Sequence, residues 1–201
     1  MCSALGLLVY NQQEAAKAQQ SATELLPKLM SEIELKKQEI KESAAGQDAA
    51  NQPQLPEIWQ EFQESEPVEM PQLEIDGDKY IGYLSIPTLQ LDLPVMGDWS
   101  YPKLKKAPCR YTGNMNEDNL VIMAHNYAYH FGGLKDLNTG DNVFFTDMDG
   151  NIVIYEVITR DILNPTAIEE VTAGDYDLTL FTCTYGGKSR VTVYCDRMEG
   201  N

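Results

Sequence analysis

Several common cofactor-binding motifs are missing from this sequence. It has no Walker phosphate loop, no Rossmann glycine fingerprint and no Cys-x-x-Cys pair, so nucleotide and zinc cofactors have no support. Cations are also scarce, because 15 Lys and Arg stand against 31 Asp and Glu, for a formal net charge of −16. Such a charge repels phosphate backbones. We therefore expect no cofactor and no nucleic-acid partner.

Apolar runs long enough to cross a bilayer are missing as well. Residues 1–10 are apolar and uncharged, whereas a crossing takes roughly 20 residues. We interpret them as the remnant of an N-terminal membrane anchor, with an ordinary chain terminus as the alternative. Residues 11–75 are rich in Gln, Glu, Lys and Ala, which predicts a partly helical stalk with a linker over 44–56. Residues 76–201 remain as the main domain.

Short segments of β character fill this main domain. They are rich in β-branched and aromatic residues, and turn signals such as Asp-Met-Asp-Gly-Asn at 147–151 separate them. The pattern favours an all-β barrel or sandwich. The expected strands are 80–86, 120–124, 142–145, 151–159, 178–183 and 190–195.

The last two of these strands predict a hairpin that sets a thiol opposite a guanidinium. A short loop with Gly-Gly joins them, and symmetric pairing about that loop places Cys183 opposite Arg190 and Phe181 opposite Thr192. Opposed side chains have Cβ atoms roughly 4.5–5.5 Å apart. An arginine at that distance can stabilise a thiolate or an oxyanion that develops beside the sulfur.

A thiolate nucleophile usually needs a proton acceptor, and the chain has only two histidines. His125 directly follows the apolar run 120–124, which a strand would hold rigidly. His130 lies in an aromatic segment with two glycines. We therefore expect His125 to be the general base and acid, and His130 to be a loop residue.

Four segments in order resemble the sortase family, the cysteine transpeptidases that anchor or polymerise surface proteins in Gram-positive bacteria. Residues 179–183, Thr-Leu-Phe-Thr-Cys, match the family's Thr-Leu-x-Thr-Cys signature, Arg190 follows at a similar spacing, and 121–126 is similar to the histidine strand. Residues 81–95 resemble the first barrel strands, and 134–143 the stretch after the histidine. Asn126 departs from the Arg of several sortase classes, so the class stays open.

The resemblance implies a fold and an activity. The fold is a closed eight-stranded β-barrel with short helices in the connections, preceded by a partly helical extension, and 76–201 is its catalytic domain. Sortases cleave a Leu-Pro-x-Thr-Gly-like sorting signal between Thr and Gly, hold the protein as a thioester, and pass it to an amine of a cell-wall precursor. Cys183 is then the nucleophile, His125 the proton carrier and Arg190 the oxyanion group. Substrate contacts are expected from Phe181, Thr182, Ile162 and Ile168.

Partners and location follow from the same resemblance. Surface proteins that carry a sorting signal are the expected substrates, and the domain is expected outside the cell on a single N-terminal membrane anchor. One alternative is a sortase that polymerises pilins, although residues 56–59, Pro-Glu-Ile-Trp, lack the Asp-Pro-aromatic lid motif of many such enzymes. An alternative of another class is a non-catalytic surface module in which the barrel displays the N-terminal stalk to a protein partner.

Acidic and sulfur side chains outside the expected site have ordinary interpretations. Glu169 and Glu170, near Asp175 and Asp177, could bind calcium as in some sortases, but acidic loop residues are usually solvated and this spacing matches no dedicated calcium loop. Cys195 alternates with valines and is expected in the core. A disulfide between Cys109 and Cys195 suits an extracellular protein, but the sequence leaves the connectivity open.

Overall fold

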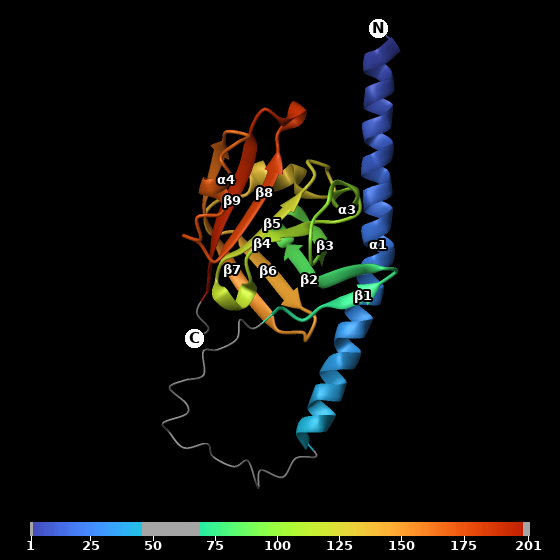
Figure 1. The fold of residues 1–201 in the computed structure, drawn as a ribbon, viewed down its shortest axis with the longest axis vertical. Coiled ribbons are helices and arrows are strands. Elements are labelled where there is room, and N and C mark those ends of the chain that lie inside the picture. The colour runs from blue at the N-terminus through green and yellow to red at the C-terminus, as the bar shows by residue number, and fades with distance from the viewer. Residues whose placement is uncertain (1, 46–68, 199–201) are drawn as a thin grey trace.

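A β-barrel lies beside one long helix in the computed structural model, which describes residues 2–45 and 69–198 (Figure 1). The helix is α1 (Cys2–Ala45). The strands are β1 (Leu73–Ile75), β2 (Asp78–Ile86), β3 (Leu91–Met96), β4 (Cys109–Thr112), β5 (Leu120–Ala124), β6 (Asn142–Asp147), β7 (Ile152–Leu163), β8 (Leu178–Cys183) and β9 (Arg190–Arg197). Short helices in the connections are η1 (Pro87–Leu89), α3 (Tyr101–Leu104), η2 (Met115–Glu117), η3 (Phe131–Asp136), α4 (Ile168–Val171) and η4 (Tyr185–Gly187).

The strands form one closed mixed sheet. Their order is β1-β2-β3-β4-β5-β8-β9-β7-β6, and β2 also pairs with β6. All strands except β1 therefore close into a ring of eight, which confirms the predicted barrel. Gly82 of β2 lies at the closing seam opposite Asp147. A Cβ atom there would collide with the carbonyl of Thr146, so the seam requires glycine.

β5 and β8 are buried on both faces, which explains the unbroken apolar run of β5. Their inward side chains, such as Ile122 and Leu180, belong to the main core cluster. On the outer face Val121 and Phe181 pack against Val171 of α4. The segment between β7 and β8 thus covers the outside of the barrel beside these strands.

The register of the C-terminal hairpin is the predicted one. Cys183 pairs with Arg190, Phe181 with Thr192, and Leu178 with Cys195. Gly186 and Gly187 of η4 have φ angles of 77° and 70°. This left-handed backbone is what the Gly-Gly pair supplies to the turn.

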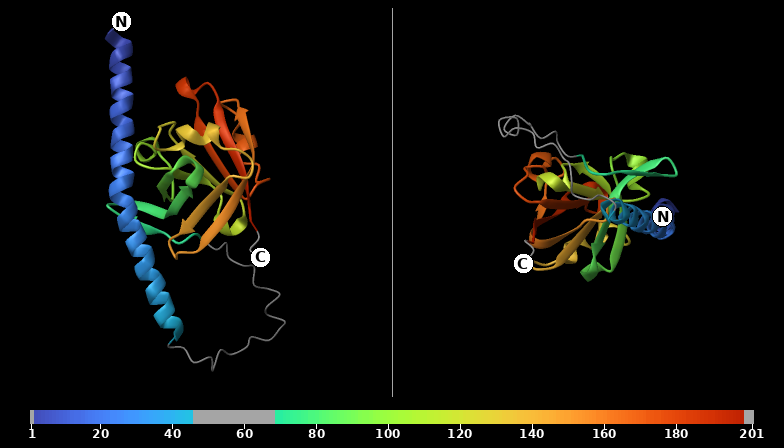
Figure 2. Two further views of the ribbon diagram at one scale, coloured as in Figure 1. Left: turned by 180° about the vertical axis from the view of Figure 1, so that it is seen from behind. Right: turned by 90° about the horizontal axis from the view of Figure 1, so that it is seen from below.

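Helix α1 packs along the barrel near β3 and extends past it at its N-terminal end (Figures 1 and 2). Leu29 and Ile33 are buried in a cluster with Tyr80, Met96 and Met148. No helix in the described part of the chain is long and apolar enough to span a membrane. The predicted division at residues 10 and 75 stays a prediction, although α1 continues across residue 10.

The expected linker and the expected disulfide fall on different parts of the chain. Most of the expected linker, and the residues 56–59 at the position of a lid motif, lie outside the described residues. Cys109 and Cys195 are described, and both are free and buried. They belong to different clusters, so no disulfide joins them and the predicted core position of Cys195 is confirmed.

Packing of α1 on the barrel can be tested with two leucines of the same helix. We expect Leu29→Ala to lower the free energy of unfolding by about 2–4 kcal/mol, because Leu29 is 0% exposed and its loss leaves a cavity. Leu35→Ala is the matched control, since Leu35 is 54% exposed, and should change stability by at most about 0.5 kcal/mol. Urea unfolding measures both. Equal effects would show that α1 is not held by this contact.

Candidate active site

The parallel pairing of β5 with β8 brings His125 and Cys183 to the same end of the barrel. Ala124 pairs with Thr182, and the next residue on each chain is the histidine or the cysteine. Neighbouring strands lie about 4.8 Å apart, so the two residues are lateral neighbours. The Thr182 hydroxyl donates a hydrogen bond to the carbonyl of Ala124, at 2.8 Å, which ties the strand ends together.

The antiparallel pairing of β8 with β9 brings the third group. Arg190 lies directly opposite Cys183. Its Nη1 donates to the carbonyl of Ser189 at 3.4 Å, and no carboxylate among the described residues forms an ion pair with it. The guanidinium is therefore free to bind an anionic or carbonyl oxygen of a substrate.

All three groups line one cavity of about 290 Å³. Its remaining wall is mainly apolar and aromatic. Tyr111 stacks on Trp99, with ring centroids 5.8 Å apart, and meets Phe181 edge to face at 5.4 Å. The other lining residues are Tyr101, Leu104, Met123, Ala124, Pro165, Ala167, Ile168 and Val171.

The predicted substrate contacts divide into two groups. Phe181 and Ile168 line this cavity. Thr182 instead lines a separate cavity of about 210 Å³ together with Asn126, because alternation along the strand turns it away from Cys183. Ile162 is 72% exposed and pairs with Val191, outside the cavity.

Trp99, Tyr101 and Tyr111 are cavity residues that sequence reasoning did not find. Trp99 and Tyr101 precede or begin α3, and Tyr111 belongs to β4. In the sequence they are recognisable only as aromatic residues. No local pattern predicts that they lie close to a cysteine about 70 or more residues further on. The barrel closure supplies that connection.

His125 is half-buried, and its surroundings favour the neutral imidazole. Burial lowers its pKa, the nearby Lys105 cation lowers it further, and the Glu14 carboxylate opposes these effects. Lys105 and Glu14 form an ion pair at 3.1 Å, which links the segment after α3 to α1. A neutral ring at neutral pH is able to accept a proton.

His130 has a different environment. It is 0% exposed, and neither ring nitrogen has a hydrogen-bond partner among the described residues. Burial, with a smaller effect of His125, lowers its pKa to about 4. It does not line the cavity that contains Cys183, so its position agrees with a residue that carries no proton in the reaction.

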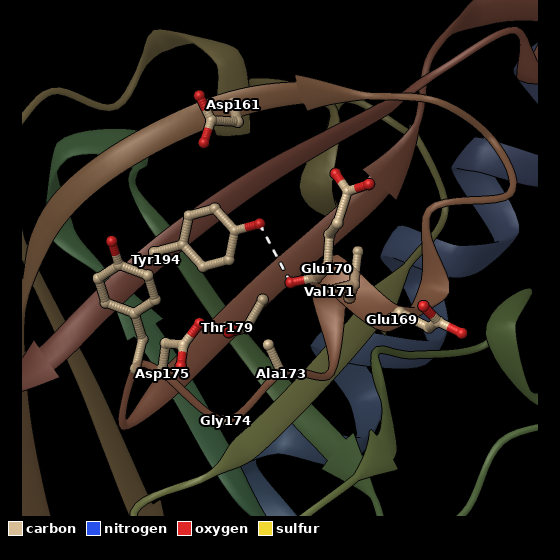
Figure 3. Close-up of a pocket in the computed structure, with 10 residues that line it drawn as sticks. Asp161, Glu169, Glu170, Val171, Ala173, Gly174, Asp175, Thr179 and Tyr194 are labelled. Carbon is tan, nitrogen blue, oxygen red and sulfur yellow. Dashed lines mark hydrogen bonds between the residues drawn. The ribbon is translucent and has the colours of Figure 1, made fainter.

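A second, acidic cavity of about 440 Å³ lies across α4 from the first. Figure 3 shows Asp161, Glu169, Glu170 and Asp175 around its edge, with Tyr194 within it. The four carboxylates are spread apart and point in different directions (Figure 3). Among the described residues no three His, Cys, Asp or Glu side chains lie close enough to hold a metal ion. The expectation of no cofactor stays a prediction.

Comparison with known proteins decides the family. A model of the sortase domain matches residues 84–198, more than half of the chain. The chain belongs to the sortase family. No curated protein matches this sortase at a significant level.

Solved sortases share the fold. Sortase C1 of Streptococcus suis is 26% identical, with 61% of this chain and 74% of that one covered and a TM-score of 0.54. Sortase C of Streptococcus pneumoniae is 20% identical, with 89% and 96% covered and a TM-score of 0.56. A sortase D5 transpeptidase of Clostridium perfringens is 22% identical, with 60% and 79% covered and a TM-score of 0.54. At 20% and 22% identity, the last two comparisons show a similar fold alone.

The buried His130 predicts a pH dependence of stability. Its pKa falls from 6.5 in the unfolded chain to about 4 in the fold, so between these pH values only the unfolded chain binds the proton. Stability should therefore fall as the pH drops, by about 2 kcal/mol between pH 7 and pH 5 from this residue. In His130→Phe this contribution disappears. Urea unfolding of both proteins at the two pH values measures it, and a parallel change in both would contradict it.

Proposed function

We propose that this sortase cleaves a Leu-Pro-x-Thr-Gly-like sorting signal between Thr and Gly and transfers the protein to an amine of a cell-wall precursor. As a sortase it is a transpeptidase. The observation that carries the residue assignment is the meeting of Cys183, His125 and Arg190 in one cavity. The apolar wall beside them suits the Leu-Pro part of the signal.

The first half-reaction forms a thioester. Neutral His125 takes the proton of the Cys183 thiol, and the thiolate so formed attacks the carbonyl carbon of the Thr residue. The resulting tetrahedral oxyanion is stabilised by the Arg190 guanidinium. The C–N bond to Gly then breaks, and protonated His125 gives its proton to the leaving amine. The substrate protein remains bound to Cys183 through Thr.

The second half-reaction reverses these roles. The acceptor amine attacks the thioester carbon while neutral His125 takes the proton that the amine loses. Arg190 again stabilises the oxyanion. Collapse of the intermediate forms the new amide bond and releases the Cys183 thiolate, which takes the proton back from His125. The enzyme thus returns to its starting thiol and neutral imidazole.

A lysine of a pilin subunit is a second candidate acceptor. Two sortases of similar fold support it, namely sortase C2 of pilus island 1 of group B Streptococcus and the Streptococcus pneumoniae sortase C, whose structure bears on pilin substrate specificity. The two acceptors differ in the amine that resolves the thioester. To distinguish them, the enzyme is offered a peptide with an N-terminal glycine and a peptide with a lysine side-chain amine together. The product shows which amine is joined to Thr.

We also propose that the N-terminal end of α1 connects the domain to the membrane, with the barrel outside the cell. The N-terminal end of α1 and the β8–β9 turn lie on the same side of the molecule (Figure 1). An anchor there would hold the cavity toward the membrane, where newly exported surface proteins emerge.

The nucleophile assignment is tested with a fluorogenic sorting-signal peptide. Cys183→Ala and His125→Ala should each abolish cleavage, because one removes the attacking sulfur and the other the proton carrier. Cys109→Ala is the matched control, since Cys109 is buried away from the cavity, and it should keep its activity. Turnover by Cys183→Ala would refute the mechanism, and an unreactive Cys183 thiol in the wild type would favour the non-catalytic module.

The role of Arg190 is tested by Arg190→Lys. Lysine keeps the charge but lacks the planar fork that binds two oxygens, so kcat should fall by roughly 10²–10³, the effect of losing one oxyanion donor. Alkylation of Cys183 should change less, because it needs the thiolate and forms no oxyanion. A near wild-type kcat, or an alkylation rate that falls as far as kcat, would contradict this role.

A further inference from the structure

Three aromatic rings follow one another in the segment after β5, and each is tilted against the next. The ring centroids of His125 and Tyr127 are 4.9 Å apart with an interplanar angle of 35°. Those of Tyr127 and His130 are 5.5 Å apart at 45°. Tyr127 therefore contacts both imidazoles, and we call the three residues the aromatic ladder.

The ladder accounts for the buried His130. A buried polar group without a partner is costly, yet both nitrogens of this ring have none among the described residues. With its pKa lowered to about 4, the ring is neutral and gives the fold no charge. What it contributes is a flat aromatic surface behind Tyr127.

The backbone of the same segment is fixed to η3. The amides of His130 and Gly132 donate to the carbonyl of Tyr127 at 3.0 and 2.9 Å, and the amide of Phe131 donates to the carbonyl of His125 at 3.2 Å. A Cβ atom on Gly132 would lie 2.6 Å from the Tyr127 carbonyl oxygen, so glycine permits this close turn. Phe131 itself is in the core.

The His125 ring contacts the ladder but has no hydrogen bond to a described side chain. A catalytic base is commonly oriented by a third group that bonds its far nitrogen, but no described side chain hydrogen-bonds the His125 ring. The charged groups that act on its pKa are Lys105 and Glu14, which form an ion pair with each other. The tilted contact with the Tyr127 ring is thus the aromatic contact that the His125 imidazole makes.

We propose that Tyr127, supported by His130, is a positioning residue that holds the His125 imidazole in the orientation for proton transfer at Cys183. This inference rests on the proposed function for its catalytic consequence. The ring contact itself is independent of any substrate, so it can be read out in the free enzyme.

The test compares leucine substitutions at two tyrosines of one segment. Tyr127→Leu removes the middle ring, and we expect kcat for the sorting-signal peptide to fall about 10- to 100-fold with little change in KM, because a misplaced group slows chemistry more than binding. Tyr127→Phe keeps the ring and should restore kcat. Tyr129→Leu is the matched control, since Tyr129 is 47% exposed and outside the ladder, and it should behave as wild type.

Titration of the His125 imidazole by NMR gives a readout without substrate. Loss of the covering ring rehydrates His125, so its pKa should rise toward 6.5 in Tyr127→Leu and stay near the wild-type value in Tyr127→Phe. His130→Leu is a second variant, because leucine fits an apolar site and removes the two unpaired nitrogens. It should shift kcat and the His125 pKa in the same directions as Tyr127→Leu.

The outcomes separate this inference from the proposed function. If the wild type cleaves the peptide but Tyr127→Leu and Tyr129→Leu have the same kcat, the positioning role is overturned. A change in KM alone, or an unchanged His125 pKa, overturns it as well. If the wild type cleaves no sorting-signal peptide, the proposed function fails, and the catalytic role of the ladder fails with it.

Discussion

The parallel pairing of β5 with β8 is the constraint on which the site depends. These strands are far apart in the sequence, and their register, with Ala124 beside Thr182, determines that His125 and Cys183 end side by side. A slip of one residue would turn Cys183 toward the opposite face. Burial on both faces and the Thr182 hydrogen bond oppose such a slip. The proposed proton transfer and nucleophilic attack thus rely on strand packing.

The electrostatics of the site differ from those of the chain as a whole. The chain is strongly acidic, yet Arg190 has no carboxylate partner among the described residues, and the cavity around it is mostly apolar. An unpaired guanidinium in partly desolvated surroundings is more effective for a developing oxyanion than one in water. The same surroundings keep His125 neutral and able to accept a proton.

Local pattern was sufficient to predict the hairpin and the strand before His125. Alternation and the Gly-Gly loop specify which residues face each other, and the structure confirms the pairs Cys183 with Arg190 and Phe181 with Thr192. The closed barrel followed from the family resemblance. Alternation also assigns Thr182 to the face opposite Cys183, so its separation from the cavity could have been inferred from the same rule.

Other features depend on contacts between distant segments, which no local pattern contains. The bulge in β7 between Val157 and Thr159 shifts the alternation of the strand residues that follow it. It therefore determines which of them face Phe181. As a result Leu163 packs near Phe181, whereas Ile162 is exposed. The burial of His130 likewise follows from the fold of its segment onto η3. The sequence predicts a loop residue there without its burial, and Gly132 is a site of close packing.

The most direct test of the account is the mass of the enzyme during turnover. Wild-type protein mixed with a Leu-Pro-x-Thr-Gly peptide and no acceptor amine should gain the mass of the peptide up to Thr. Proteolysis should place this adduct on the fragment with Cys183, and hydroxylamine should remove it, as expected for a thioester. Cleavage of the peptide with no adduct on Cys183, or with an adduct on another residue, would contradict the account.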